Sequence, residues 1–217
     1  MTREELLQTA RPILFNTDMV RAILDGRKTV TRRICKDGND CTVPDMSFYD
    51  ADKRTYAVHN YSDKEHTEKL SLAERTCPIC PGDILYVRET WAELKNANGS
   101  HKRYVYRATD TFPFGESGYI IKFCWSPSLH MPKEAARIFL RVRNARIERL
   151  QDITDAEAEK EGGQPQNPFD YAVNKWPNLE HFKEIWNSTI KKSDIDRYGW
   201  KANPWVWVIE FERVYPE

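Results

Sequence analysis

The residues best suited to chemistry lie in one short stretch, residues 26–33, which reads Gly-Arg-Lys-Thr-Val-Thr-Arg-Arg. After its glycine, the stretch carries one lysine, two threonines and three arginines within seven residues. Cationic and hydroxyl side chains at this density could converge on a polar ligand if an ordered scaffold positions them. The same composition is also typical of a solvent-exposed basic turn, and the residue types alone do not separate the two.

The stretch falls at the boundary between a predicted helix and a predicted strand. Gly26 suits the position after a helix C-terminus, where the left-handed conformation is needed. Before it, Asn16 or Thr17 is a candidate N-cap for a helix whose apolar residues recur with a period of 3.6. These apolar residues are Met19, Val20, Ile23 and Leu24. After it, the β-branched residues of 29–34 predict a strand.

The rest of the chain reads as several strands and a few short helices. Residues 1–10 are weakly helical, and the motif Thr154–Glu157 predicts a capping box for a helix that ends near Gly162. The remaining predicted helix spans 178–191, and the remaining predicted strands span 12–15, 84–91, 103–107, 120–125, 138–150 and 205–211. Because helices do not alternate with strands, we expect an α+β fold around a small curved or closed sheet.

Composition indicates a globular protein without a strong charge of either sign. Lys plus Arg and Asp plus Glu each total 33, so no global cationic field attracts nucleic acid, and a nucleic-acid partner would have to meet a local basic patch. No apolar run reaches the length of a membrane span, and no signal peptide is evident. We therefore expect a cytoplasmic protein without a membrane partner, and infer no obligate protein partner.

We expect one domain over residues 1–217, with an insertion at about 36–76. The inserted part is rich in Asp, Asn, Lys, Ser and Tyr and has almost no helical periodicity. Long segments of this kind are often functional, and this one could serve as a lid, a partner surface or a metal-held knob.

The five cysteines fit a reducing compartment better than a disulfide framework. Cys77 and Cys80 have the spacing of half a zinc site, which Cys35 and Cys41 could complete. The second pair is widely spaced, so incidental thiols in a turn are the favoured interpretation. We assign no metal ligand and no cofactor.

Several ordered motifs together resemble the ASCH family, and more closely its phage- and prophage-borne branch. They are residues 11–15, 26–33, 81–83, 87–91, 125–132, 147–161 and 203–208. The resemblance implies a PUA-like small β-barrel with a few short flanking helices and an inserted loop region. The family motif is Gly-x-Lys-x-x-Glu-x-Arg, and this chain has Thr31 where the family usually has glutamate.

The departure at Thr31 is itself similar to a bacterial branch that hydrolyses N4-acetylcytidine through a lysine, a threonine and a glutamate. The resemblance carries the first two roles to Lys28 and Thr31. It carries the third to Glu161, although Glu157 and Glu159 are close enough to leave the register open. The implied function is an amidohydrolase acting on N4-acylated cytidine or a related modified nucleoside.

Such an enzyme would use Thr31 as nucleophile, Lys28 as its base and Glu161 as proton shuttle. Arg27 and Arg32 would favour the neutral form of the lysine. In a regular strand, Lys28 and Thr31 would point to opposite faces, since the side-chain period is two. The mechanism therefore requires Lys28 to lie in the turn before the strand, or a bulge between the two residues.

The alternative is a non-catalytic module that binds single-stranded RNA or a nucleotide. Lys28, Arg32 and Arg33 would then contact phosphate, while Trp91 or Trp125 stacks on a base.

Two further residues are candidates for substrate binding, each with a structural alternative. Glu89 lies with Arg88 at the end of a predicted buried strand, where an Arg/Glu pair usually satisfies itself. His130 is a lone histidine in a turn-rich segment, where a structural role is more common than a ligand contact.

Overall fold

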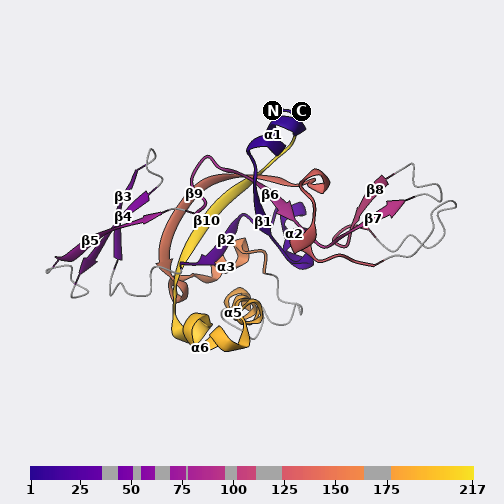
Figure 1. The fold of residues 1–217 in the computed structure, drawn as a ribbon. Helices are drawn as coiled ribbons and strands as arrows, with labels where there is room; N and C mark the ends of the chain where they lie inside the picture. The colour runs from indigo at the N-terminus through magenta and orange to yellow at the C-terminus, as the bar shows by residue number, and fades with distance from the viewer. Residues whose placement is uncertain are drawn as a thin grey trace. The chain divides into compact units, whose positions relative to one another are not determined.

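The computed structural model describes residues 1–35, 44–50, 55–61, 69–76, 78–95, 102–110, 124–163 and 177–217. Within them the chain has a mixed α+β fold, as the sequence predicts (Figure 1). The α-helices are α1 (Arg3–Thr9), α2 (Thr17–Leu24), α3 (Asp155–Lys160), α5 (Pro177–Thr189) and α6 (Ile195–Tyr198). The strands are β1 (Arg11–Leu14), β2 (Val30–Ile34), β3 (Pro44–Asp50), β4 (Thr55–Tyr61), β5 (Lys69–Thr76), β6 (Ile84–Arg88), β7 (Trp91–Lys95), β8 (Lys102–Tyr106), β9 (Phe139–Arg149) and β10 (Trp205–Val214).

The chain divides into two compact units that alternate along the sequence. Unit 1 comprises Met1–Lys28, Asp83–Arg141 and Glu212–Glu217. Unit 2 comprises Thr29–Gly82 and Val142–Phe211. The expectation of one domain over 1–217 stays a prediction, and each unit is described below by itself.

The main sheet is mixed, with the strand order β1-β6-β9-β10-β2. In unit 1, β1 pairs in parallel with β6, and β6 pairs antiparallel with the start of β9. In unit 2, β10 pairs antiparallel with β2, which sets Ile209 opposite Thr31 and Val208 opposite Arg32. The described strands do not form a closed barrel, so the PUA-like barrel stays a prediction.

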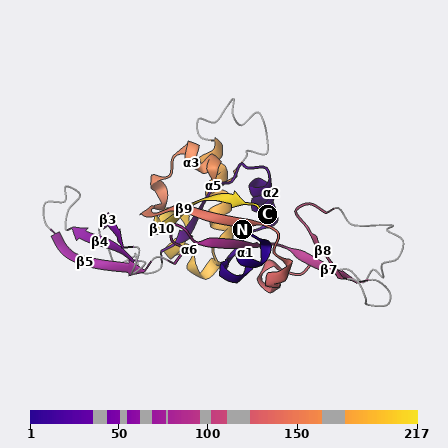
Figure 2. The same ribbon diagram turned by 90° about the horizontal axis from the view of Figure 1, so that it is seen from above.

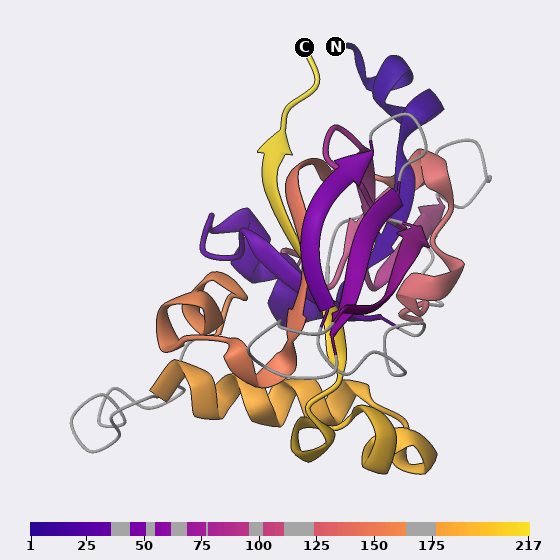
Figure 3. The same cartoon turned by 90° about the vertical axis from the view of Figure 1, so that its left-hand side faces the viewer.

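Unit 2 is built on an apolar cluster shared by its strands and helices. Helix α5 lies against α3, as Figure 3 shows. The buried members of the cluster are Val30, Leu150, Ile153, Ala158, Phe182, Trp186, Val206 and Val208. The cluster therefore holds β2 and α3 on one core, and these two elements carry most of the candidate residues of this unit.

The predicted insertion contains a separate small sheet of three strands. β3 pairs with β4, and β4 with β5, all antiparallel (Figure 2). The segment that lacks helical periodicity thus contains three strands. Among the described strands, these three pair only with one another.

Unit 1 has its own core around β6 and the start of β9. Its buried members are Leu6, Ala10, Tyr86, Met131, Ala135, Ala136 and Phe139. Helix α1 contributes Leu6, which is fully buried, so the N-terminal segment is a packed helix rather than a weakly helical lead-in. The sequence contains the reason: Thr2 and Glu5 form a reciprocal capping box that satisfies the first turn.

Most other element boundaries agree with the sequence to within two residues, with three exceptions. The last strand, predicted to end at residue 211, runs on to Val214. The strand predicted to run to Trp91 ends at Arg88, and Trp91 instead begins β7, which pairs with β8. Of the strand predicted at 120–125, residues 120–123 lie outside the described part of the chain.

None of the described helices combines the length and the apolar character that a bilayer crossing requires.

Candidate functional site

The turn between α2 and β2 places Lys28 before the strand begins. Gly26 has φ +76°, and the carbonyl of Ala22 accepts hydrogen bonds from the backbone N–H groups of Arg27 (2.9 Å) and Lys28 (3.0 Å). β2 starts only at Val30. Lys28 thus lies in the helix-to-strand turn, which is the position that the proposed mechanism requires.

Lys28 is buried although its side chain carries an ionisable amine. Only 3% of the residue is exposed, and its Nζ lies 5.6 Å from the centre of the Phe15 ring, within unit 1. A buried ammonium is costly and is usually retained for a specific purpose. Arg27 differs, because its guanidinium pairs with Asp25 at 3.0 Å near the surface.

In unit 2, the side chains of Thr31 and Arg33 contact each other through a hydrogen bond. Thr31 is buried, and its Oγ1 accepts a hydrogen bond from Nη1 of Arg33 at 2.8 Å. The two residues are separated by one position and share a face of β2. Burial lowers the pKa of Arg33 from its ordinary value, while the charge of Glu161 acts in the opposite direction.

Arg32 points away from Thr31 and enters a cluster of carboxylates. Its side chain is fully buried, and it pairs with Glu148 (Nη2 to Oε1, 2.5 Å) and Glu161 (Nη1 to Oε1, 3.2 Å). Glu157 lies 3.4 Å from Nη2, and the ring of Phe182 lies 5.9 Å from the guanidinium. Arg32 therefore anchors β2 to β9 and to the end of α3.

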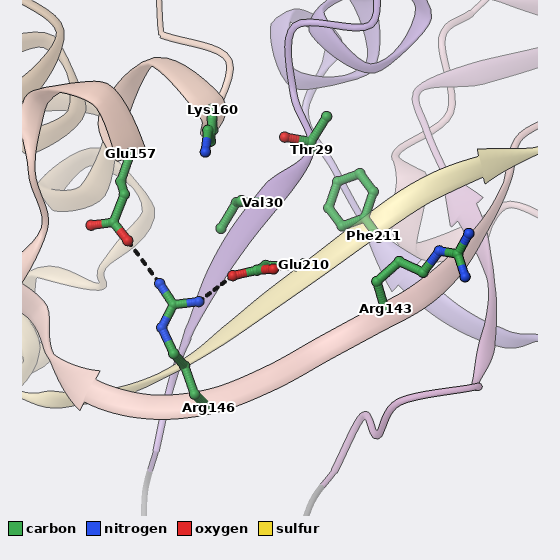
Figure 4. Close-up of a pocket in the computed structure, with 8 residues that line it drawn as sticks. All are labelled: Thr29, Val30, Arg143, Arg146, Glu157, Lys160, Glu210 and Phe211. Carbon is green, nitrogen blue, oxygen red and sulfur yellow. Dashed lines mark hydrogen bonds and ion pairs between the residues drawn. The ribbon is translucent and has the colours of Figure 1, made fainter.

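A second arginine, Arg146 on β9, extends this cluster. It donates to Glu148. It also donates to Glu157 at 2.8 Å and to Glu210 on β10, as Figure 4 shows. Burial lowers the pKa of Arg146, but the charges and hydrogen bonds of Glu148 and Glu210 outweigh it and raise the pKa above its ordinary value. We call the set Arg32, Arg146, Glu148, Glu157, Glu161 and Glu210 the carboxylate network.

Within this network, Glu157 and Glu161 have different surroundings. The carboxylate of Glu157 caps α3 by accepting from the backbone N–H of Thr154 at 3.1 Å, and it also holds Arg146. Glu161 follows the last turn of α3, is only 5% exposed, and bonds Arg32 while its charge acts on Arg33. Of the two, Glu161 is the one linked electrostatically to the residue that holds Thr31.

Glu89 is held in unit 1 by an arginine that the sequence did not indicate. The buried carboxylate accepts from Arg137 at 2.8 and 2.9 Å, whereas Arg88 donates to the Met131 carbonyl. Arg137 also lies 3.9 Å from the ring centre of Tyr106, whose hydroxyl donates to the carbonyl of Ala135. The polar groups of this cluster thus pair with one another, which favours the structural role of Glu89.

The aromatic candidates of unit 1 pack mainly against their own unit. Trp91 meets Tyr104 edge to face at 5.7 Å, and Trp125 packs on the small core of β7 and β8. Nε1 of Trp91 is buried without a hydrogen-bond partner among the described residues. His130 is exposed and ends the short 3-10 helix Ser128–His130.

The described part of unit 2 contains an open pocket of about 230 Å³ beside the start of β2 (Figure 4). Its lining combines a phenyl ring, a threonine hydroxyl, cationic side chains and two carboxylates of the network. These residues are Thr29, Val30, Arg143, Arg146, Glu157, Lys160, Glu210 and Phe211. We call this the Lys160 pocket.

Of the four cysteines that could form a zinc site, the structure describes two. Cys35 and Cys80 are buried thiols, whereas Cys41 and Cys77 lie outside the described residues. Among the residues that the structure describes, no group of three or more His, Cys, Asp or Glu side chains is arranged to hold a metal ion.

Comparisons with known proteins add no neighbour: no family model, no curated protein and no solved structure matches this chain. The fold and the site by themselves define an α+β protein with buried polar side chains, Thr31 and Arg32, on the last strand of a mixed sheet.

The sequence did not reveal the partners that organise this cluster. Arg146, Glu148 and Glu210 complete the network, and Lys160 lines the pocket. One signal was present: Arg146 and Glu148 are two residues apart on β9, so a two-residue period places them on the same face. Which strand or helix they meet depends on pairing across the sheet.

Proposed function

We propose that this chain is an ASCH-type amidohydrolase that removes the acyl group from N4-acylated cytidine or a related modified nucleoside. The observation that carries the proposal is the buried Thr31 hydroxyl, which accepts a hydrogen bond from the Arg33 guanidinium. A cationic donor at this oxygen favours the alkoxide over the hydroxyl, so it activates a nucleophile.

The Thr31 hydroxyl is also able to release its proton. Among the described residues, its only recorded hydrogen bond is the one it accepts from Arg33. We assign Lys28 as the base, because burial is the physical effect that favours the neutral, proton-accepting form of a lysine. Arg32, in contrast, is assigned a positioning role, since its guanidinium is enclosed by carboxylates.

The reaction proceeds in two half-reactions. In the first, Oγ1 of Thr31 bonds to the acyl carbon as its proton passes to Nζ of Lys28. The bond from the acyl carbon to N4 breaks, and the Glu161 carboxylate relays the proton from Lys28 to N4. In the second, water attacks the acyl ester, and the proton that the water loses passes through Glu161 and Lys28 to Oγ1 as the bond to the acyl carbon breaks. The products are cytidine and the free carboxylic acid, and no cofactor is consumed.

Two further parts of the proposal follow from the resemblance. We propose that the mixed sheet belongs to a PUA-like fold, and that the protein acts in the cytoplasm on a nucleoside or on single-stranded RNA. These assignments rest on the motifs around Lys28 and Thr31.

The first test measures release of acetate and cytidine from N4-acetylcytidine. We expect turnover by the wild type, and a loss of about 10³-fold or more in Thr31→Val, which keeps the side-chain shape but removes the nucleophile. Glu161→Gln should lose about 10²-fold, the scale of general acid–base catalysis. The neighbouring exposed carboxylate provides the matched control, because Glu159→Gln should keep wild-type turnover.

A wild-type protein that releases no acid from any N4-acylated cytidine would refute the enzyme assignment. Retained turnover in Thr31→Val would refute the nucleophile instead. If the wild type binds cytidine nucleotides or single-stranded RNA without turnover, the alternative of a non-catalytic binding module stands in its place.

A further inference from the structure

The Lys160 pocket contains two side chains that have no hydrogen-bond or ion-pair partner in the described part of the chain, Nζ of Lys160 and Oγ1 of Thr29. Lys160 and Thr29 both line the pocket, and Figure 4 shows their side chains at the same end of it. A backbone hydrogen bond from Thr29 N–H to the Lys160 carbonyl (2.9 Å) holds the two residues together. The Thr29 carbonyl also accepts from the Phe211 N–H at 2.9 Å, which fixes this end of the pocket to β10.

The carboxylates of the pocket are already neutralised, so they do not exclude an anion. Glu157 and Glu210 both accept hydrogen bonds from Arg146. The lining itself has three cationic side chains, Arg143, Arg146 and Lys160, against two carboxylates. The cation without a partner among the described residues, Lys160, is exposed at the pocket and available to a ligand.

The pocket also lies at a useful distance from the proposed nucleophile. Thr29 precedes Thr31 by two residues, so their Cα atoms lie at most about 7 Å apart. That spacing is comparable to the distance from the base to the phosphate of one nucleotide. Since β2 is the last strand in the order of the main sheet, we place the base of such a ligand near Thr31 and its sugar-phosphate at Thr29 and Lys160.

We infer that the Lys160 pocket binds a phosphate ester on the ribose of the substrate, through the ammonium of Lys160 and the hydroxyl of Thr29. The inference rests on the proposed function for its nucleoside base, and it names the substrate class: a nucleotide rather than a free nucleoside. The phosphate can belong to a mononucleotide or to the backbone of single-stranded RNA, and both present the same group to an ammonium and a hydroxyl donor.

The test compares binding of cytidine with binding of cytidine 5′-monophosphate and cytidine 3′-monophosphate by isothermal titration calorimetry. We expect the wild type to bind one of the monophosphates about tenfold more tightly than cytidine. Lys160→Ala should reduce this ratio to near one, and Lys160→Arg should keep most of it. Thr29→Val, which preserves shape and the backbone hydrogen bonds, should reduce it about threefold.

A matched control removes a different exposed lysine of unit 2. Lys191→Ala should keep the wild-type ratio, because Lys191 does not line the pocket. A short single-stranded RNA that contains one cytidine separates the two sources of phosphate. Tighter binding of this RNA than of either monophosphate, with the excess lost in Lys160→Ala, assigns the phosphate to an RNA backbone.

Equal affinity of the wild type for cytidine and both monophosphates would overturn the inference, as would a ratio unchanged in both Lys160→Ala and Thr29→Val. These outcomes are independent of catalysis. If N4-acetylcytidine is not hydrolysed but the phosphate preference is present and depends on Lys160, the pocket assignment stands and the hydrolase assignment fails.

Discussion

Two adjacent arginines of the Gly26–Arg33 stretch have opposite surroundings and therefore different roles. Arg32 is enclosed by carboxylates and by the ring of Phe182, so its guanidinium is ion-paired within unit 2 and stabilises the packing of β2. Arg33 lies on the other face of β2 and donates to Thr31. Removing one member of a buried ion-paired set leaves the others unpaired, which typically costs about 3–5 kcal/mol. A loss of activity in an Arg32 variant would therefore report stability, not ligand contact.

At the same scale, Tyr106 in unit 1 gives a pH-dependent contribution to stability. Burial raises its pKa from 10.0 to about 12, with Arg137 lowering it and Glu89 raising it. Between these two values the unfolded chain loses the phenolic proton while the folded protein keeps it. The stabilising contribution is thus complete below pH 10 and is lost as the pH rises through about 12.

We expect Tyr106→Phe to reduce the decline of the unfolding free energy above pH 10, because a phenyl ring cannot ionise in the unfolded chain. Urea denaturation at a series of alkaline pH values measures the slope. Tyr215→Phe, at a tyrosine that is 66% exposed, is the control. An identical slope in Tyr106→Phe and wild type would contradict this account of the tyrosine.

At the scale of elements, the turn from α2 to β2 places Lys28 off the strand. The left-handed Gly26 ends the helix, and the Ala22 carbonyl then collects two backbone hydrogen bonds from the turn. The N-terminus of α2 is equally well defined, since the Asn16 side chain accepts from the Met19 N–H at 2.8 Å. The two caps fix the length of the helix, and with it the residue at which the chain enters β2.

We predict that Gly26→Ala lowers the free energy of unfolding by about 1–2 kcal/mol, the cost of a left-handed conformation for an L-residue. A Cβ at Gly26 meets nothing within 4 Å, so backbone strain is the whole effect. Gly26→Asn should lose less, because asparagine tolerates this conformation. Equilibrium urea unfolding checks the order, and equal losses for alanine and asparagine would count against a strain mechanism.

At the scale of the whole molecule, the chain carries an inserted sheet whose described strands pair only among themselves. β3, β4 and β5 lie between β2 and β6 in sequence, but none pairs with a strand of the main sheet. The main sheet therefore takes no hydrogen-bonded strand from the described part of the insertion.

We expect that replacing residues 44–76 by a flexible Gly/Ser linker of about twelve residues, long enough to span about 20 Å, leaves one cooperative thermal transition. The melting temperature should stay within about 4 °C of the wild type, since the described strand pairing of the main sheet is kept whole. Differential scanning calorimetry provides the measurement. Loss of the cooperative transition would show that the insertion contributes to the core.

The sequence by itself determined the elements that local chemistry controls. Gly26, the Asn16 cap and the Thr154 capping box mark helix ends through bonds between residues a few positions apart, and periodicity identified β9, α5 and β10. These signals operate within one turn or one strand, so they can be read along the chain. The same holds for the position of Lys28 before β2, which follows from the turn at Gly26.

Only the tertiary structure decided which side chains meet. Arg32 finds Glu148 and Glu161 at sequence separations of 116 and 129 residues, because β9 and the end of α3 pack against β2. The pocket around Lys160 likewise draws its walls from β2, β9, β10 and α3. These contacts depend on sheet order and register, which a local sequence pattern does not encode. They also distinguish the role of Arg32, which anchors the fold, from that of Arg33, which donates a hydrogen bond to the proposed nucleophile.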